Sequence, residues 1–91
     1  MASVAIADFT PETGAITMFS TEWCGYCKRL KTMLDGTGIP YTIVDIEKMP
    51  GTEELVMSVN GGNAVVPTVV YPDGTTGTNP SLGEVKQKLG L

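Results

Sequence analysis

Hydrophobic and polar residues alternate along the chain in two patterns, one typical of strands and one typical of helices. Three short apolar or β-branched segments and one short polar segment after them are predicted to be strands, at residues 15–19, 41–45, 65–71 and 75–78. Three other segments repeat apolar residues at helical spacing and are predicted to be helices, from about 24 to 34, 51 to 59 and 82 to 89. The predicted order of elements is therefore βαβαββα.

Turn and capping residues separate these elements. Residues 35–38, Asp-Gly-Thr-Gly, are predicted to stop the first helix, with Gly36 as its left-handed cap. Residues 60–63, Asn-Gly-Gly-Asn, end the second helix, and residues 72–74, Pro-Asp-Gly, form the turn of a hairpin. The Ser-Leu-Gly-Glu sequence at residues 81–84 matches a capping box at the start of the last helix.

The first strand, first helix and second strand together span about 30 residues, the length of a βαβ unit. Their two strands should be parallel and joined by a right-handed crossover, which indicates an α/β fold. Residues 1–13 show neither pattern and are predicted to be a loose lead-in. Because the chain has 91 residues and no internal repeat, we expect a single domain over residues 1–91.

Composition narrows the possible functions. A net charge of −4 argues against a nucleic-acid partner and against an anionic membrane surface. The absence of histidine removes the commonest general base and the commonest metal ligand. No apolar run has the length of a transmembrane helix, and the N-terminal residues lack the basic region of a signal peptide. We therefore expect a cytoplasmic protein.

Both cysteines lie in one short motif, Trp23-Cys24-Gly25-Tyr26-Cys27-Lys28, where a predicted strand leads into a predicted helix. In the reducing cytoplasm such a pair is more often catalytic or metal-binding than structural. Two thiolates supply only half of a tetrahedral zinc site, and a disulfide within one helical turn closes almost no loop. The motif therefore predicts a redox-active dithiol with no metal site.

The two cysteines should differ in reactivity. At the start of the helix, Cys24 would lie beside unpaired backbone N–H groups and the positive end of the helix dipole, which stabilise a thiolate. We expect Cys24 to be acidic, exposed and nucleophilic, with Lys28 adding positive charge nearby. One turn further, Cys27 should be less exposed and less acidic. Trp23 and Tyr26 could face a substrate or could only pack against the protein.

The order of elements and two short motifs resemble the thioredoxin fold in its minimal, glutaredoxin-like form. The motifs are Cys24-Gly25-Tyr26-Cys27 and Val66-Pro67-Thr68, and the resemblance extends from about residue 15 to residue 89. It implies a four-stranded mixed sheet with helices on both faces. It also implies a cis Pro67 beside the cysteines and a Val66 backbone that binds a sulfur-bearing substrate as an added strand would. A proline of an ordinary edge strand or bulge is the alternative.

The chain departs from glutathione-dependent glutaredoxins at two places. These proteins usually carry a lysine three residues before the first cysteine, where this chain has Thr21. They also carry a Gly-Gly pair and acidic residues before the last helix, where residues 77–81 read Gly-Thr-Asn-Pro-Ser. Such an uncharged surface suits a neutral, hydroxyl-rich thiol better than glutathione. The candidate substrate-binding residues are Thr21, Trp23, Tyr26, Val66, Pro67, Thr78, Asn79 and Ser81.

These features are similar to those of mycoredoxins, the glutaredoxin-like enzymes of bacteria that use mycothiol, a cysteine derivative of a glucosamine–inositol pseudodisaccharide. The resemblance implies a monomer with no bound cofactor that reduces S-mycothiolated proteins. Cys24 would take mycothiol from the mixed disulfide, and a second mycothiol would release mycothiol disulfide for recycling by an NADPH-dependent reductase. Cys27 would then be dispensable.

Two other functions fit the same motif. One is a small redoxin that takes electrons from thioredoxin reductase and passes them on as a dithiol. The other is an iron–sulfur carrier, in which two chains bridge a cluster through Cys24 and two low-molecular-weight thiols.

Overall fold

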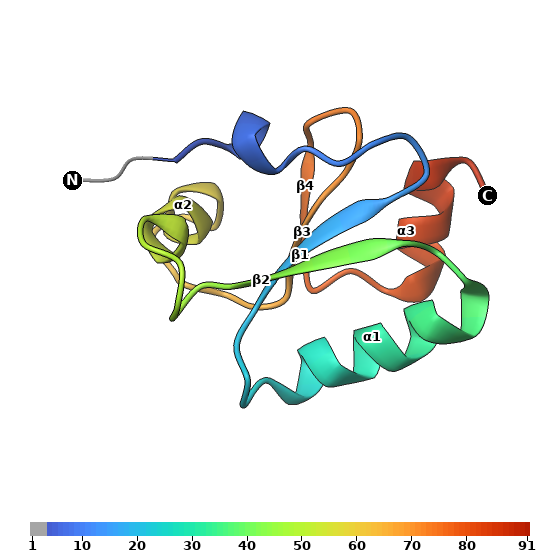
Figure 1. The fold of residues 1–91 in the computed structure, drawn as a ribbon, viewed down its shortest axis with the longest axis horizontal. Helices are drawn as coiled ribbons and strands as arrows, with labels where there is room; N and C mark the ends of the chain where they lie inside the picture. Colours follow the sequence, from blue (N-terminus) through green and yellow to red (C-terminus); the bar gives the residue numbers. More distant parts are fainter. Residues whose placement is uncertain (1–3) are drawn as a thin grey trace.

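The computed structural model describes residues 4–91 and confirms the predicted order of strands and helices (Figure 1). A 3-10 turn, η1, precedes this series. The elements are η1 (Ile6–Phe9), β1 (Ile16–Ser20), α1 (Gly25–Thr37), β2 (Tyr41–Asp45), α2 (Thr52–Val59), β3 (Thr68–Val70), β4 (Thr76–Thr78) and α3 (Leu82–Leu89).

The strands form one four-stranded mixed sheet in the order β2-β1-β3-β4. β1 pairs in parallel with β2, as the βαβ unit predicts, and in antiparallel fashion with β3. β4 completes the sheet as the antiparallel partner of β3. The α/β fold class is therefore confirmed. β1 is an interior strand with β2 and β3 on either side, and its carboxyl end leads into the cysteine motif at one end of the sheet (Figure 1).

Each face of the sheet has its own hydrophobic core. α1 and α3 cover one face, and α2 and η1 cover the other (Figure 1). Because side chains alternate along a strand, Ile16 and Met18 of β1 enter the first core and Phe19 enters the second. All five residues of β1 are buried, and its two polar side chains, Thr17 and Ser20, donate hydrogen bonds to backbone carbonyls.

The predicted boundaries are wrong at the end of α1 and at both ends of β3. α1 continues through Gly36 to Thr37, and the left-handed cap is Gly38 (φ 75°), whose N–H donates to Leu34 O at 3.0 Å. The third strand begins at Thr68 rather than at residue 65, because the preceding proline has no N–H to offer to a neighbouring strand. It ends at Val70, since the N–H of Tyr71 closes the hairpin by donating to Thr75 O.

Part of the lead-in is ordered, contrary to the prediction for residues 1–13. The ring of Phe9 in η1 packs edge-on against Phe19, with ring centroids 5.1 Å apart. The carbonyl of Phe9 also accepts a hydrogen bond from Thr17 Oγ1 at 2.6 Å. These contacts fix η1 on the second core, while residues 1–3 lie outside the described residues. Within residues 4–91, no helix is long and apolar enough to cross a membrane.

Candidate active site

Cys24 and Cys27 form a disulfide at the beginning of α1. Cys24 is the N-cap residue of the helix, and Cys27 lies in its first turn, with the two Cα atoms 5.2 Å apart. Cys27 is completely buried and is therefore less exposed than Cys24, as predicted. A single helical turn therefore places the two sulfur atoms.

The sulfur of Cys24 takes the place of a capping oxygen. Its Sγ accepts a hydrogen bond from the backbone N–H of Cys27 at 3.0 Å, in the position that a serine or aspartate oxygen commonly occupies. A thiolate at this point lies at the positive end of the helix dipole and accepts a backbone N–H. Both effects favour the charged form of Cys24 over the neutral thiol.

The exposure predicted for Cys24 is wrong for this oxidised form, because only 4% of the residue is accessible. As the N-cap, its Sγ turns back over the first helical turn and lies 3.7 Å from the carbonyl oxygen of Val66. This contact joins the two motifs on which the family resemblance rests. The Val66–Pro67 peptide bond is cis, as the resemblance implies. Pro67 is fully buried just before β3, an interior strand, so the edge-strand alternative is wrong.

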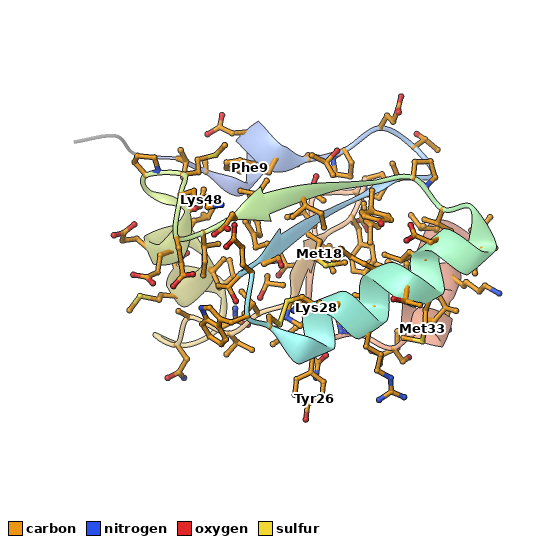
Figure 2. All side chains as sticks on the ribbon, turned by 60° about the horizontal axis from the view of Figure 1, so that its bottom comes forward. Phe9, Met18, Tyr26, Lys28, Met33 and Lys48 are labelled. Atoms are coloured by element: carbon orange, nitrogen blue, oxygen red, sulfur yellow. A yellow bond between two sulfur atoms is a disulfide. The ribbon has the colours of Figure 1, made fainter. Side chains whose placement is uncertain are left out.

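Two aromatic side chains flank the disulfide at the surface. Trp23 is 71% exposed and Tyr26 is 64% exposed, and Figure 2 shows Tyr26 projecting from the N-terminal end of α1 into solvent. The indole N–H of Trp23 donates to Glu47 Oε1 at 3.1 Å, and the neighbouring Glu22 pairs with Lys48. Because neither ring packs in a core, their positions favour a substrate-facing role over a packing role.

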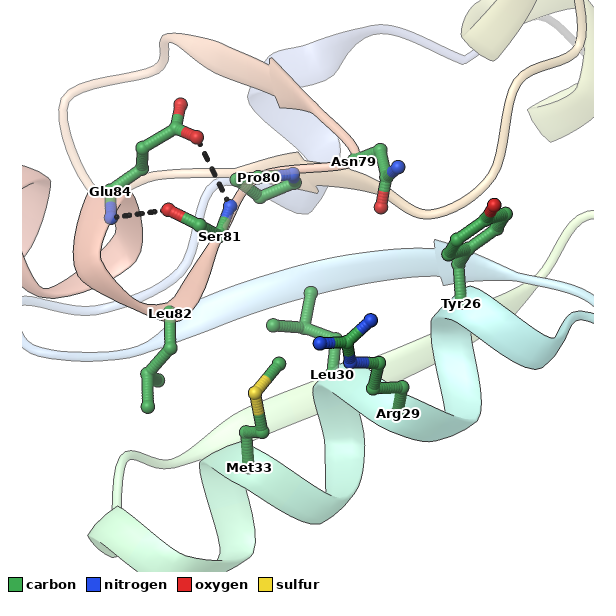
Figure 3. A pocket seen from close by; sticks show the side chains of 9 residues that line it. All are labelled: Tyr26, Arg29, Leu30, Met33, Asn79, Pro80, Ser81, Leu82 and Glu84. Atoms are coloured by element: carbon green, nitrogen blue, oxygen red, sulfur yellow. Dashed lines mark hydrogen bonds between the residues drawn. The ribbon is translucent and has the colours of Figure 1, made fainter.

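A groove of about 310 Å³ runs beside the site between α1 and the start of α3 (Figure 3). Three predicted substrate-binding residues, Tyr26, Asn79 and Ser81, line it together. The other lining residues are Arg29, Leu30, Met33, Pro80, Leu82 and Glu84. The sequence did not single out Arg29 and Glu84 as members of one groove. Helical spacing could have predicted the α1 side of the groove, because residues 26, 29, 30 and 33 share one face of that helix.

Comparison with known proteins identifies the family. The model of the glutaredoxin family, described as "Glutaredoxin", matches residues 16–75. The chain belongs to the glutaredoxin family. This glutaredoxin is 57% identical over 77 residues to a glutaredoxin predicted for Mycobacterium tuberculosis strain H37Rv, covering 85% of this chain and 92% of that protein. It is 45% identical over 74 residues to mycoredoxin 1 of Corynebacterium glutamicum, covering 81% and 91%.

Solved structures agree on the fold of this glutaredoxin. The holo form of glutaredoxin C1 from Populus tremula x tremuloides superimposes with a TM-score of 0.68 at 23% identity, covering 93% of this chain and 91% of that one. The glutaredoxin from Methanosarcina mazei Go1 gives a TM-score of 0.71 at 21% identity, covering 100% and 85%. Family, fold and the Cys24–Cys27 disulfide together establish a thiol–disulfide oxidoreductase.

Three of the predicted site residues, Thr21, Thr78 and Ser81, are buried or bonded within the fold. Thr21 is buried, and within residues 4–91 its hydroxyl oxygen has no hydrogen-bond partner, so it presents little surface to a ligand. Thr78 donates its hydroxyl to Asn60 Oδ1. Ser81 and Glu84 form the predicted capping box, with the Glu84 N–H donating to Ser81 Oγ at 3.1 Å.

Within residues 4–91, no group of three or more histidine, cysteine, aspartate or glutamate side chains is placed to hold a metal ion.

The capping geometry predicts an acidic Cys24. In the reduced Cys27→Ser variant, which leaves a single thiol and keeps the backbone N–H of residue 27, ultraviolet titration should give a thiolate midpoint well below about 8.5. The physical reason is that the N–H bond and the helix dipole both act on the charged form. A midpoint at or above that value would contradict the role assigned to the helix start.

Proposed function

We propose that this glutaredoxin reduces mixed disulfides between proteins and mycothiol, with Cys24 as the nucleophile. The observation that carries the proposal is the placement of an uncharged segment, residues 77–81, beside the Val66–Pro67 motif. The N–H of Asn79 donates to Pro67 O at 2.7 Å, which holds this segment against the Val66–Pro67 motif that contacts Cys24. The 45% identity to a protein named mycoredoxin 1 supports the same thiol.

The proposed reaction has two exchange steps. The Cys24 thiolate attacks the mycothiol sulfur of the mixed disulfide, and the protein thiolate leaves and takes a proton from water. A second mycothiol, as its thiolate, then attacks the mycothiol sulfur bound to Cys24, which releases mycothiol disulfide and restores the Cys24 thiolate. An NADPH-dependent reductase returns the two electrons to mycothiol disulfide, so the glutaredoxin itself needs no bound cofactor.

The residues around Cys24 have separate roles in this reaction. The N–H of Cys27 stabilises Cys24 both as attacking and as leaving thiolate. The backbone of Val66 receives the cysteine unit of mycothiol as an added strand would. In the groove, Asn79 and Ser81 can bond to sugar hydroxyls. Arg29 on the α1 side adds a charged donor, and Glu84 on the α3 side adds a charged acceptor.

Thr21 bears on the choice of thiol because it places no positive charge at this position. Because its side chain is buried, it is unsuited to the direct contact with substrate that the sequence predicted. A lysine at this position would offer a cation to the carboxylates of glutathione, and threonine offers none. Thr21 therefore fits a site that disfavours a zwitterionic peptide thiol rather than one that grips mycothiol through this residue.

The choice of electron source tests the proposal. A mycothiolated protein is supplied either with mycothiol, mycothiol disulfide reductase and NADPH, or with thioredoxin reductase and NADPH, and NADPH oxidation is followed by absorbance. We expect turnover only in the first mixture. Turnover only in the second would identify a thioredoxin-reductase-dependent redoxin and overturn the proposal. Glutathione with its own reductase serves as the matched control and should support much slower turnover.

A further inference from the structure

Asn60, the residue directly after α2, joins three elements through its side-chain amide. Its Nδ2 donates to Val56 O of α2 at 2.9 Å and to Thr68 Oγ1 of β3 at 3.0 Å. Its Oδ1 accepts the hydroxyl proton of Thr78 in β4. Both ends of the amide are therefore used, and each contact lies on a different element.

The two threonines are direct partners across the hairpin. Thr68 and Thr78 form the terminal pair of the β3–β4 ladder, and each strand has only three residues. Such a short ladder has few backbone bonds, and beyond this terminal pair one further bond, from the Asn79 N–H to Pro67 O at 2.7 Å, joins the two segments. Asn60 bonds both threonine hydroxyls at that end, so it clamps the two strands where they leave the sheet.

The clamp lies one residue away from both segments that frame the active site. Thr68 follows Pro67 directly, and its hydroxyl donates to Val65 O at 2.8 Å, so it closes the loop that presents Val66 to Cys24. Thr78 precedes Asn79, whose left-handed backbone (φ 46°) turns the chain toward the groove. Each of these two segments is therefore adjacent to a threonine whose hydroxyl is hydrogen-bonded to Asn60.

We propose that Asn60 is a positioning residue, which fixes the Val66–Pro67 and Thr78–Asn79 segments relative to each other and thereby aligns the cysteine unit of a thiol substrate with Cys24. The inference deepens the proposed function and rests on its premise that a cysteine-based thiol binds along Val66. Asn60 does not touch Cys24 in the hydrogen-bond network, so its effect should fall on alignment of the substrate and not on the reactivity of the thiolate.

Two reactions of the reduced full-length protein separate these effects. The first is exchange with a mixed disulfide that carries N-acetylcysteine methylamide, which needs alignment along Val66. The second is alkylation of Cys24 by iodoacetamide, which needs only the thiolate. For Asn60→Ala we expect the second-order rate constant of exchange to fall about tenfold, with alkylation unchanged within about twofold.

Matched variants sharpen the test. Thr78→Val removes one bond of the clamp and should lower exchange about threefold, and the double variant should be no worse than Asn60→Ala alone, because both changes break one network. Asn63→Ala is the control. Within residues 4–91 its exposed side chain bonds only the carbonyl of Asn60, at 3.5 Å, so both rates should stay at the wild-type value.

Equal losses in both reactions, or an unchanged exchange rate, would overturn the inference, since the first indicates a general structural role and the second no role. If Asn60→Ala does not fold, Thr78→Val alone decides, and an unchanged exchange rate there would overturn it as well. The probe contains only the N-acylcysteine unit, which mycothiol shares with other cysteine-based thiols. A failure of the mycothiol proposal would therefore appear in the electron-source experiment, and the exchange and alkylation rates of the variants could still be interpreted.

Discussion

Replacing Cys24 with serine is expected to lower the rate of mixed-disulfide reduction by about a thousandfold or more, because a serine hydroxyl is not ionised at neutral pH and cannot replace the thiolate nucleophile. The loss should appear in turnover of a mycothiolated protein, followed by release of its free thiol. The variant should keep its fold, since serine is also a good N-cap residue and can accept the N–H of residue 27.

Cys27→Ser is the matched variant and should retain reduction of the same substrate. Cys27 lies fully buried in the first turn of α1, and its backbone N–H, which the substitution keeps, is the group that stabilises Cys24. In the proposed monothiol route a second mycothiol, and not Cys27, resolves the mixed disulfide. If both variants were inactive, the reaction would need the dithiol, and the monothiol route would be wrong.

Phe19→Ala should reduce the free energy of unfolding by about 3–5 kcal/mol, a large share of the roughly 5–15 kcal/mol typical of a domain. Phe19 is completely buried in the core between the sheet and α2, at the point where β1 approaches the cysteine motif. Equilibrium unfolding in urea, monitored by circular dichroism, would measure the change. An effect below about 1 kcal/mol would contradict the packing assigned to this core.

Phe9→Ala tests the docking of η1 in the same experiment. Its ring is only partly buried and touches Phe19 edge-on, so we expect a smaller loss of about 1–2 kcal/mol. A wild-type unfolding curve for Phe9→Ala would mean that the lead-in does not dock on the core in solution, as the sequence had suggested.

The sequence predicted the fold well because most of its signals are local. The apolar run that became β1 and the helical spacing of Leu30 and Leu34 depend on neighbouring residues alone. The same holds for the Ser81–Glu84 capping box, which the structure confirms atom by atom. The cap of α1 was misplaced because residues 36 and 38 are both glycines, and which of them closes the helix depends on how far its last turn continues.

The cis Pro67 came from a resemblance and not from any local pattern. A proline at the start of a β-branched segment also fits an edge strand, and only the interior position of β3 and the contact of Val66 with Cys24 exclude that alternative. The order of Phe9 was missed for a related reason. A single aromatic residue in an otherwise irregular segment carries no periodicity, and its partner, Phe19, lies on a strand.

The sequence by itself determined the chemistry of this protein: a Cys-x-x-Cys pair at a helix start, in a βαβαββα chain without histidine, indicates thiol–disulfide exchange. The tertiary structure decided what surrounds that pair. It brought Val66 to Cys24 across 42 residues, placed Arg29 and Glu84 on one groove, and clamped Thr68 to Thr78 through Asn60. These contacts depend on strand register and on how helices pack against the sheet, and both are set by the whole chain rather than by the residues next to the site.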